Sequence, residues 1–387
     1  MSDDTFTTTT SQSWLSRLGS AISGVLFGIL LFLGSFILLT WNEGRAIHRA
    51  KTLDLGAKQV ISISPDAPLP ANEGKLVHLT GTAEADGPVA DKVFGITASA
   101  LKLRRDVEMY QWKQDEKSTT KQKLGGGEEK TTTYSYSKTW SRTLIDSSKF
   151  QHPSEHNNPE SLPVESKTFT APGIHVGKFD LPESLTDKIT NYAARPVTGE
   201  EAQATARKHS EDMSVTTGGL LYVGTDPKNP EIGDLRVTFQ TAPAGPVSII
   251  AGQNGSTFEP FTIRNLGSIE LLQPGTLSAD AMFQQEKEGN ATLTWILRLV
   301  GFVMMIIGLL LVTNVLSVAA SVIPFLGDIV GAGTGMLAIV VALPLTLLTI
   351  ALSWLAYRPL IGVPLLLLTA GSVVLAVMRL SKSRKTA

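Results

Sequence analysis

The sequence predicts an integral membrane α-helical protein, with four transmembrane helices and a large extramembrane α+β, sheet-rich domain. Long apolar runs without charged residues lie near the two ends of the 387-residue chain. The middle is polar and contains many alternating β-branched residues. The chain has no cysteine, which excludes disulfides and cysteine metal sites, so the middle must be stabilised by its own core.

The first apolar run, residues 18–41, predicts the first transmembrane helix, because crossing the hydrocarbon core takes about 20 residues. A cleaved signal peptide is the competing interpretation, but it would have a shorter apolar core and a small-residue cleavage site. Here the run is longer and ends in bulky Leu38, Leu39 and Trp41. We therefore expect an anchor, preceded by an N-terminal tail over residues 1–17.

Three further spans are expected after the domain, one at 292–316 and two at 336–357 and 360–378. The last two are so close together that they predict a tight helical hairpin. The stretch 317–335 is moderately apolar and is broken by Pro324. It predicts a connector that is either a surface-lying amphipathic helix or a re-entrant segment.

The orientation follows from the basic residues. Four spans place both termini on one side, and the basic tail 379–387 argues that this side is cytoplasmic. Arg17 alone precedes the first span, while several basic residues follow it, which taken alone favours the opposite orientation. Long domains translocate largely regardless of charge, so the tail carries more weight. We expect residues 42–291 to be periplasmic or lumenal.

The extramembrane domain is expected to be dominated by antiparallel sheet. Period-two runs of β-branched and aromatic residues predict strands at 75–82, 101–112, 131–144, 174–179, 219–223, 234–241 and 246–253. Gly125–Gly127 lies in the position of a hairpin tip. Helices are expected at 184–193 and 278–288, with a loop at 147–165.

No motif predicts catalysis, a cofactor or a metal. The sequence contains no nucleophile elbow, phosphate-binding loop or zinc framework. His152 and His156 flank a carboxylate, but Pro153 opposes a helix that would place both rings on one face. The 34 basic and 35 acidic residues give a net charge of −1, so nucleic acid is not an expected partner.

Charged residues near the ends of the spans form a candidate polar cluster at the membrane interface: Glu43, Arg45, Arg298 and Arg358. Ionisable groups at membrane depth are costly and point to function. Each could instead reach the headgroups independently, as a simple anchor. The alternative is that Glu43 pairs with Arg358 and locks the first helix to the hairpin.

Small residues at four-residue spacing mark candidate helix-packing positions. They are Ser20, Gly24 and Gly28 in the first span, and Gly327, Gly331 and Gly335 before the third. Such stripes let helix backbones approach closely. Packing within one chain and association between copies both remain open.

Several blocks of residues carry a family resemblance: Trp41–Arg45, Asn72–His78, Lys102–Trp112, Tyr134–Tyr136, Pro230–Val237 and Leu347–Leu360. In this order they resemble the transmembrane protein 43 family, also called LUMA. The resemblance covers nearly the whole chain and implies the layout derived above. It implies the endoplasmic reticulum and inner nuclear membrane in animals, where the family is associated with emerin and lamins. The family also occurs in bacteria, and the lack of cysteine favours a bacterial member in the inner membrane. It offers no catalytic residue to carry over.

Two functions are compatible with these features. The first is a non-enzymatic membrane scaffold that self-associates and organises membrane lipids and other membrane proteins. The second is a membrane-embedded lipid-handling protein, a channel or transporter, or a lipid-modifying enzyme. An enzyme would need polar groups that converge on one pocket at the bilayer surface.

Overall fold

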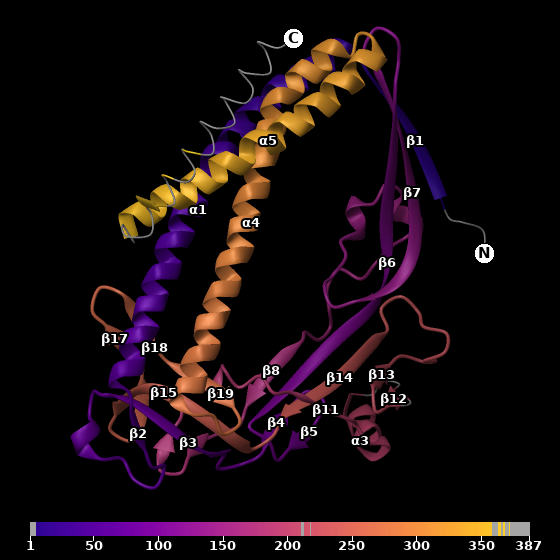
Figure 1. Cartoon of the computed structure of the whole chain (residues 1–387). Coiled ribbons are helices and arrows are strands. Elements are labelled where there is room, and N and C mark those ends of the chain that lie inside the picture. Colours follow the sequence, from indigo (N-terminus) through magenta and orange to yellow (C-terminus); the bar gives the residue numbers. More distant parts are fainter. Residues whose placement is uncertain are drawn as a thin grey trace. The chain divides into compact units, whose positions relative to one another are not determined.

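The computed structural model describes residues 5–209, 213–216 and 218–357, together with positions 363, 364, 367 and 371 (Figure 1). The chain forms two compact units, which are described separately. The first contains the chain up to Thr7, Leu55–Lys117 and Thr132–Phe283. The second contains Thr8–Asp54, Ser118–Thr131 and the chain from Gln284 onward.

The strands are, in chain order, β1 (Thr5–Gln12), β2 (Ile61–Ile63), β3 (Leu76–Glu84), β4 (Val89–Asp91), β5 (Ile96–Ala98), β6 (Lys102–Gln122), β7 (Glu128–Ser141), β8 (Lys167–Thr170), β9 (His175–Val176), β10 (Phe179–Asp180), β11 (Ala193–Arg195), β12 (Met213–Val215), β13 (Leu221–Val223), β14 (Leu235–Ala242), β15 (Gly245–Asn254), β16 (Thr257–Glu259), β17 (Phe261–Ile263), β18 (Gly267–Ile269) and β19 (Leu271–Pro274). The helices are α1 (Trp14–Gln59), α2 (Glu183–Thr186), α3 (Gly199–His209), α4 (Ala279–Ala320) and α5 (Pro324–Tyr357).

Two sheets make up most of the extramembrane domain. The 8-stranded sheet has the order β1-β7-β6-β14-β13-β12, with β11 beside β14 and β8 beside β6. The 7-stranded sheet has the order β10-β9-β3-β15-β16, with β19 beside β15 and β2 beside β3. In the 7-stranded sheet, every pair is antiparallel except β2 with β3. In the 8-stranded sheet, the pairs that join β6, β8, β11, β12, β13 and β14 are antiparallel. The predicted sheet-rich α+β class is therefore confirmed.

The alternation of apolar and polar residues that predicted the strands also shows which side chains face the hydrophobic core. Leu235, Val237 and Phe239 of β14 are buried, and the residues between them are only half-buried. In the other sheet, β15 is buried along most of its length. Its central Ile249 pairs with Leu79 of β3, and both side chains belong to one large hydrophobic core. A strand buried on both faces reads as a continuous apolar run rather than an alternating one.

Two local expectations in the domain are corrected by the structure. The helix expected at 184–193 is the short α2, because Ala193–Arg195 pairs with β14 as β11 and Pro196 keeps the preceding residue extended. The strand expected at 174–179 is divided into β9 and β10. Gly177 between them has φ +59°, a left-handed conformation that makes a turn.

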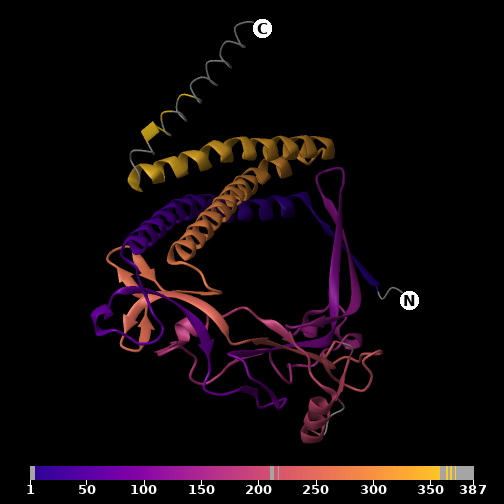
Figure 2. The same cartoon turned by 60° about the horizontal axis from the view of Figure 1, so that its bottom comes forward.

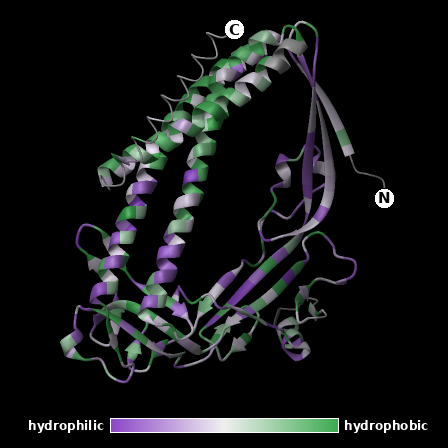
Figure 3. Ribbon diagram, in the orientation of Figure 1, coloured by the Kyte–Doolittle hydropathy of each residue, from purple (hydrophilic) through white to green (hydrophobic). Residues whose placement is uncertain are grey.

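The second unit contains three helices that are long and apolar enough to cross a membrane, all within the part of the chain that the structure describes. They are α1, α4 and α5. The fourth expected span, 360–378, lies outside the described residues apart from isolated positions. Figure 3 shows that α1 and α4 are apolar over one part of their length and polar over the rest.

Both α1 and α4 extend beyond their apolar runs. Helix α1 continues past Trp41 to Gln59, although the sequence predicted that the extramembrane domain begins at residue 42. Helix α4 joins the helix expected at 278–288 and the span expected at 292–316 into one element. The apolar run shows which part of a helix can lie in lipid. The helix itself can be longer, because its backbone hydrogen bonds continue into the polar residues on either side.

The stretch 317–335 is divided between two helices. Helix α4 ends at Ala320, and the chain reverses over a few residues (Figure 2). Pro324 is the first residue of α5, a position where its missing N–H is tolerated. The break expected at Pro324 is therefore the start of a long helix.

Candidate functional site

The feature that stands out in the second unit is a polar cluster shared by three membrane helices. Glu43 of α1 is 1% exposed and accepts two hydrogen bonds from Arg298 of α4. The Arg298 Nε and Nη2 atoms lie 2.7 and 2.9 Å from the two carboxylate oxygens. Trp354 of α5 donates its indole N–H to the same carboxylate at 2.5 Å. One buried carboxylate therefore binds both neighbouring helices.

Aromatic rings cover the guanidinium of this pair. The guanidinium carbon of Arg298, Cζ, lies 4.6 Å from the ring centroid of Trp295 and 5.6 Å from that of Trp354. A guanidinium is weakly hydrated and stacks on aromatic faces, so it tolerates this environment better than an ammonium group would. The two charges neutralise each other where the apolar part of α1 ends.

A second set of polar contacts lies beside the ion pair and involves neutral partners. Arg45 donates to Asn290 at 3.0 Å, to Thr294 at 3.1 Å and to Asn42 at 3.2 Å. Asn42 also donates to the main-chain carbonyl of Thr294 at 3.0 Å. We call Asn42, Glu43, Arg45, Asn290, Thr294, Arg298 and Trp354 the interface cluster. It joins one turn of α1 to about two turns of α4 and contacts α5 through Trp354.

The interface cluster connects three helices through hydrogen bonds and one ion pair. Glu43 accepts three hydrogen bonds, two from the Arg298 guanidinium and one from the Trp354 indole, so both of its carboxylate oxygens have donors from neighbouring helices. A shallow pocket of about 310 Å³ lies next to it, lined by Arg45, Arg49, Gln285, Glu286, Gly289, Asn290 and Leu293. Arg49 pairs with Glu286 at 2.6 Å, while Arg45 has neutral partners. Among the described residues, the hydrogen-bond partners of the Arg45 guanidinium are therefore all neutral.

The structure brings together three of the four residues that the sequence proposed for this interface. Glu43 and Arg298 are ion-paired, and Arg45 lies in the same cluster. Arg358 lies outside the described residues, so its pairing with Glu43 stays a hypothesis. Trp354, Asn42 and Thr294 were not expected at the site. Trp354 has an aromatic-belt position in the sequence, which could have indicated an indole donor at this depth.

The small residues Ser20, Gly24 and Gly28 of α1 lie in two different environments. A side chain at Gly28 would meet the Gly308 oxygen of α4 at 2.9 Å and the Leu311 Cβ at 2.8 Å. Gly28 is therefore a position of close backbone approach within the chain. Gly24 has no neighbouring atom within 4 Å among the described residues, and Ser20 is exposed. The stripe is covered at one end and open at the other.

The second stripe, which begins α5, is also divided. A side chain at Gly331 would meet the Ser317 hydroxyl of α4 at 3.1 Å, whereas Gly335 faces open space among the described residues. Gly327 lies in the stretch 324–329, whose side chains are not described. Intrachain packing therefore accounts for one position of each stripe.

His152 and His156, in the loop at 147–165, each pack against an aromatic ring. The His156 ring stacks on Tyr136, with centroids 3.8 Å apart, and its Nδ1 lies 2.9 Å from the His152 carbonyl. The His152 ring packs edge-on against Phe6. The described ranges contain no group of three or more His, Asp or Glu side chains that could hold a metal ion.

One polar pair in the domain core was missed from the sequence. Arg105 lies in the strand expected at 101–112, and the structure buries its side chain. Its guanidinium lies 2.5 Å from the fully buried carboxylate of Asp91 and also donates to the Glu165 carbonyl. A buried arginine inside an alternating strand gives no sequence signal of its own, because its partner is distant in the chain.

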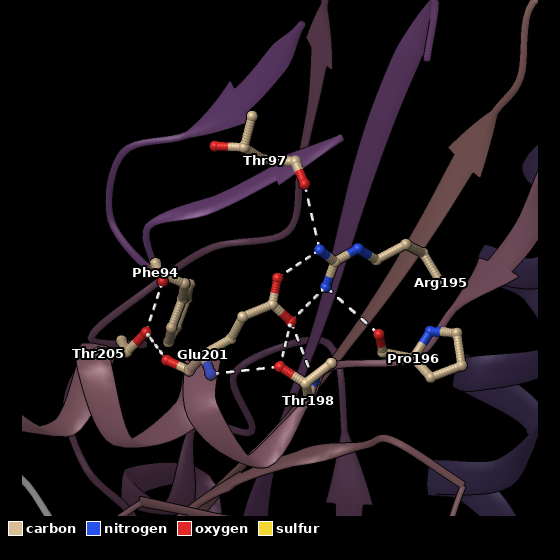
Figure 4. Close-up of polar contacts among 7 residues, drawn as sticks. All are labelled: Phe94, Thr97, Arg195, Pro196, Thr198, Glu201 and Thr205. Carbon is tan, nitrogen blue, oxygen red and sulfur yellow. Dashed lines mark hydrogen bonds and ion pairs between the residues drawn. The ribbon is translucent and has the colours of Figure 1, made fainter. Parts of the chain in front are cut away.

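The structure also contains a capped helix, α3, that was not predicted (Figure 4). Thr198 and Glu201 form a capping box, in which the Thr198 N–H donates to Glu201 at 2.9 Å and the Glu201 N–H donates to the Thr198 hydroxyl at 3.3 Å. Arg195 pairs with the same carboxylate and donates to the Thr97 carbonyl. The T-x-x-E spacing at 198–201 was the available sequence signal.

Comparison with known proteins agrees with this architecture. The family model described as "Transmembrane protein 43" matches residues 109–359. "Transmembrane protein 43" of mouse is 37% identical over 361 residues, which cover 90% of this chain and 88% of that protein. The human protein of the same name is 37% identical over 91% of this chain and 89% of its own length. "Transmembrane protein 43 homolog" of Drosophila melanogaster is 31% identical over 90% and 93%.

No solved structure matches the chain. The family match extends from within β6 to past the end of α5, and each of these relatives covers at least 90% of this chain. The chain belongs to the transmembrane protein 43 family.

Proposed function

We propose that the protein is a non-enzymatic, multi-pass membrane scaffold that self-associates and organises membrane lipids and other membrane proteins. The observation that carries the proposal is the division of the α1 stripe: Gly28 packs on α4, whereas no atom of the described residues would meet a side chain at Gly24, and Ser20 is exposed. An uncovered small-residue surface on a membrane helix suits close packing against another helix. The compartment we propose is the inner membrane in a bacterium, and the endoplasmic reticulum and inner nuclear membrane in a eukaryote.

The interface cluster supports a scaffold because it holds the helices in one arrangement. Removing one partner of a desolvated ion pair typically costs about 3–5 kcal/mol, since the other charge stays buried. A bundle closed in this way presents fixed outer surfaces to its neighbours. The Ser20–Gly24 surface of α1 would then be available in one defined orientation.

Arg45 supports the lipid part of the proposal. It lies in the pocket beside the end of the apolar run, and it donates hydrogen bonds to neutral side chains. Guanidinium groups bind phosphate through two parallel hydrogen bonds. An anionic headgroup at the membrane surface would accept hydrogen bonds from the Arg45 guanidinium in this pocket.

The test compares two leucine substitutions in the same stripe. Gly24→Leu should block association between copies and leave each chain folded, because the position faces open space. Gly28→Leu is the matched control and should instead loosen the packing of α1 on α4, lowering thermal stability. Native mass spectrometry in detergent and in nanodiscs measures the subunit number. If Gly24→Leu keeps the wild-type subunit number, this surface does not carry self-association.

A further inference from the structure

The tip of the β6–β7 hairpin contacts the start of the first membrane helix. Arg17 of α1 forms an ion pair with Glu128 at 2.5 Å and donates to the Gly126 carbonyl. The same guanidinium donates to the hydroxyl of Ser321, just after α4, at 3.1 Å. The Gly125 N–H donates to the Val322 carbonyl at 3.1 Å. Three segments that are distant in the sequence thus meet at one point, and both views show the tip beside the α4–α5 turn (Figures 1 and 2).

We call this contact between the hairpin tip, the start of α1 and the α4–α5 turn the joint. Its side chains are closely packed. The side chain of Arg17 is 10% exposed and that of Glu128 is 23% exposed. Gly126 is buried, has φ +80°, and would clash with the Trp14 ring if it carried a side chain. Trp14 also donates its indole N–H to the Val318 carbonyl at 3.0 Å. The hairpin tip is therefore part of the membrane-helix unit.

The joint has a consequence for topology. Trp14 and Arg17 lie just before the apolar part of α1, whereas strand β6 begins after α1 has passed through its apolar part. No other described helix between α1 and α4 is long and apolar enough to cross back. The chain must therefore return to the side of Trp14 within the hairpin itself. About 10 residues of strand, at about 3.3 Å each, match a hydrocarbon core of about 30 Å.

The hairpin strands are not built to face lipid. Strands of membrane barrels alternate apolar and polar residues, with the apolar side chains outward. Residues 118–122 of β6 and 128–133 of β7 are polar at every position. Strand β1, which is next to β7 and ends the sheet, is also polar except for Phe6. Neither face of this hairpin could lie against hydrocarbon, and open strand edges are not stable there.

We propose that several copies of the chain assemble with their β1–β7–β6 hairpins together at the centre, where they line a water-filled path across the membrane for small hydrophilic solutes. Three strands are too few to close a barrel, so strands from other copies must complete it. The membrane helices face the lipid, as the exposed apolar side chains of Leu26, Leu30 and Ile37 on α1 allow. This inference rests on the proposed self-association and adds a conducting role to it.

The first test locates the hairpin tip. The chain has no cysteine, so single introduced cysteines are labelled without background. Leu124 at the tip is 89% exposed, and the side chain of Lys149 in the extramembrane domain is 81% exposed. In sealed vesicles, a membrane-impermeant maleimide should label Leu124→Cys and Lys149→Cys from opposite sides. Labelling of both from the same side overturns the proposal, even if native mass spectrometry shows an oligomer.

The second test asks whether the strands lie in water. A cysteine reacts with a charged methanethiosulfonate reagent as the thiolate, which requires water around it. Thr120→Cys lies in the polar part of β6 within the proposed crossing, and Leu26→Cys on the exposed apolar face of α1 is the control. We expect Thr120→Cys to react at least about tenfold faster than Leu26→Cys. Equal, slow reaction at both positions would show that no water-filled path exists.

Discussion

Glu43 of α1 and Arg298 of α4 form a two-point ion pair, with Nε···Oε1 at 2.7 Å and Nη2···Oε2 at 2.9 Å. They lie 255 residues apart in the chain, and the pair joins the end of the first apolar run to the start of the second. Two parallel hydrogen bonds fix the planes of both groups as well as their separation. The relative rotation of α1 and α4 is thereby determined at this depth.

The first prediction concerns the energy of that pair. Glu43→Gln and Arg298→Gln should each destabilise the protein by about 3–5 kcal/mol, because each leaves an unpaired charge away from water. The double variant should lose much less than the sum of the two, since both charges are removed. Chemical denaturation of the full chain in detergent measures the three values.

The exposed pair Arg49–Glu286 is the matched control on the same two helices. Its side chains are 29% and 30% exposed. The corresponding cycle with Arg49→Gln and Glu286→Gln should give a coupling of less than about 1 kcal/mol. Equal coupling in both cycles would mean that burial adds nothing to the Glu43–Arg298 pair.

The second prediction concerns the buried pair in the domain core. Asp91→Asn keeps the hydrogen bond that this side chain accepts from the Val93 N–H but removes the charge that faces Arg105. It should destabilise the domain by about 3–5 kcal/mol. Asp115→Asn is the control, because its pair with Lys113 is about half exposed and should contribute less than about 1 kcal/mol. Urea unfolding followed by circular dichroism distinguishes the two.

The third prediction is a pH dependence carried by α3. The hydrogen bond from Arg195 lowers the pKa of Glu201 from its ordinary 4.5 to about 2. A carboxyl whose pKa is lowered on folding stabilises the folded state above its unfolded pKa and loses this contribution as pH falls. The contribution should therefore be complete above about pH 4.5 and disappear as pH falls towards about 2.

The measurement is the midpoint of thermal unfolding between pH 2 and pH 6. Glu201→Gln should flatten the profile in that window, and Glu200→Gln on the exposed neighbouring position should not. An unchanged profile in Glu201→Gln would assign the acid sensitivity to other carboxyls.

The fourth prediction concerns the cap of the same helix. Thr198→Ala removes the hydroxyl that accepts from the Glu201 N–H and should cost about 1 kcal/mol, whereas Thr198→Ser should cost little. The measurement is the rate of hydrogen exchange at the amides of the first turn of α3, which should increase in Thr198→Ala. Equal exchange in all three proteins would show that the hydroxyl is not the cap.

Local pattern was sufficient for most of the strands. The alternation around Val237 and the buried run of β15 are properties of neighbouring residues, so they were visible before any tertiary contact was known. Helix ends were less well predicted. The end of α2 depends on the pairing of Ala193–Arg195 with β14, which no local signal contains.

The candidate site shows the same limit. The sequence placed Glu43 and Arg298 at a membrane interface, because hydropathy gives depth. It did not identify them as partners, since the pairing depends on how α1 and α4 are rotated and packed. Trp354 entered the site for the same reason.

The sequence by itself determined the membrane class, the sheet-rich domain and the family. The length of an apolar run, the alternation of a strand and the order of the residue blocks that resemble the family are all properties of the linear chain. The tertiary structure decided which charges meet, which end of the Ser20–Gly28 stripe is covered, and that the hairpin tip lies against Trp14 and Arg17. The physical reason is that these contacts join segments that are far apart in the chain, from 109 residues for Arg17 and Gly126 to 304 residues for Arg17 and Ser321. Their geometry is set by the packing of whole helices and strands, and no short stretch of sequence encodes it.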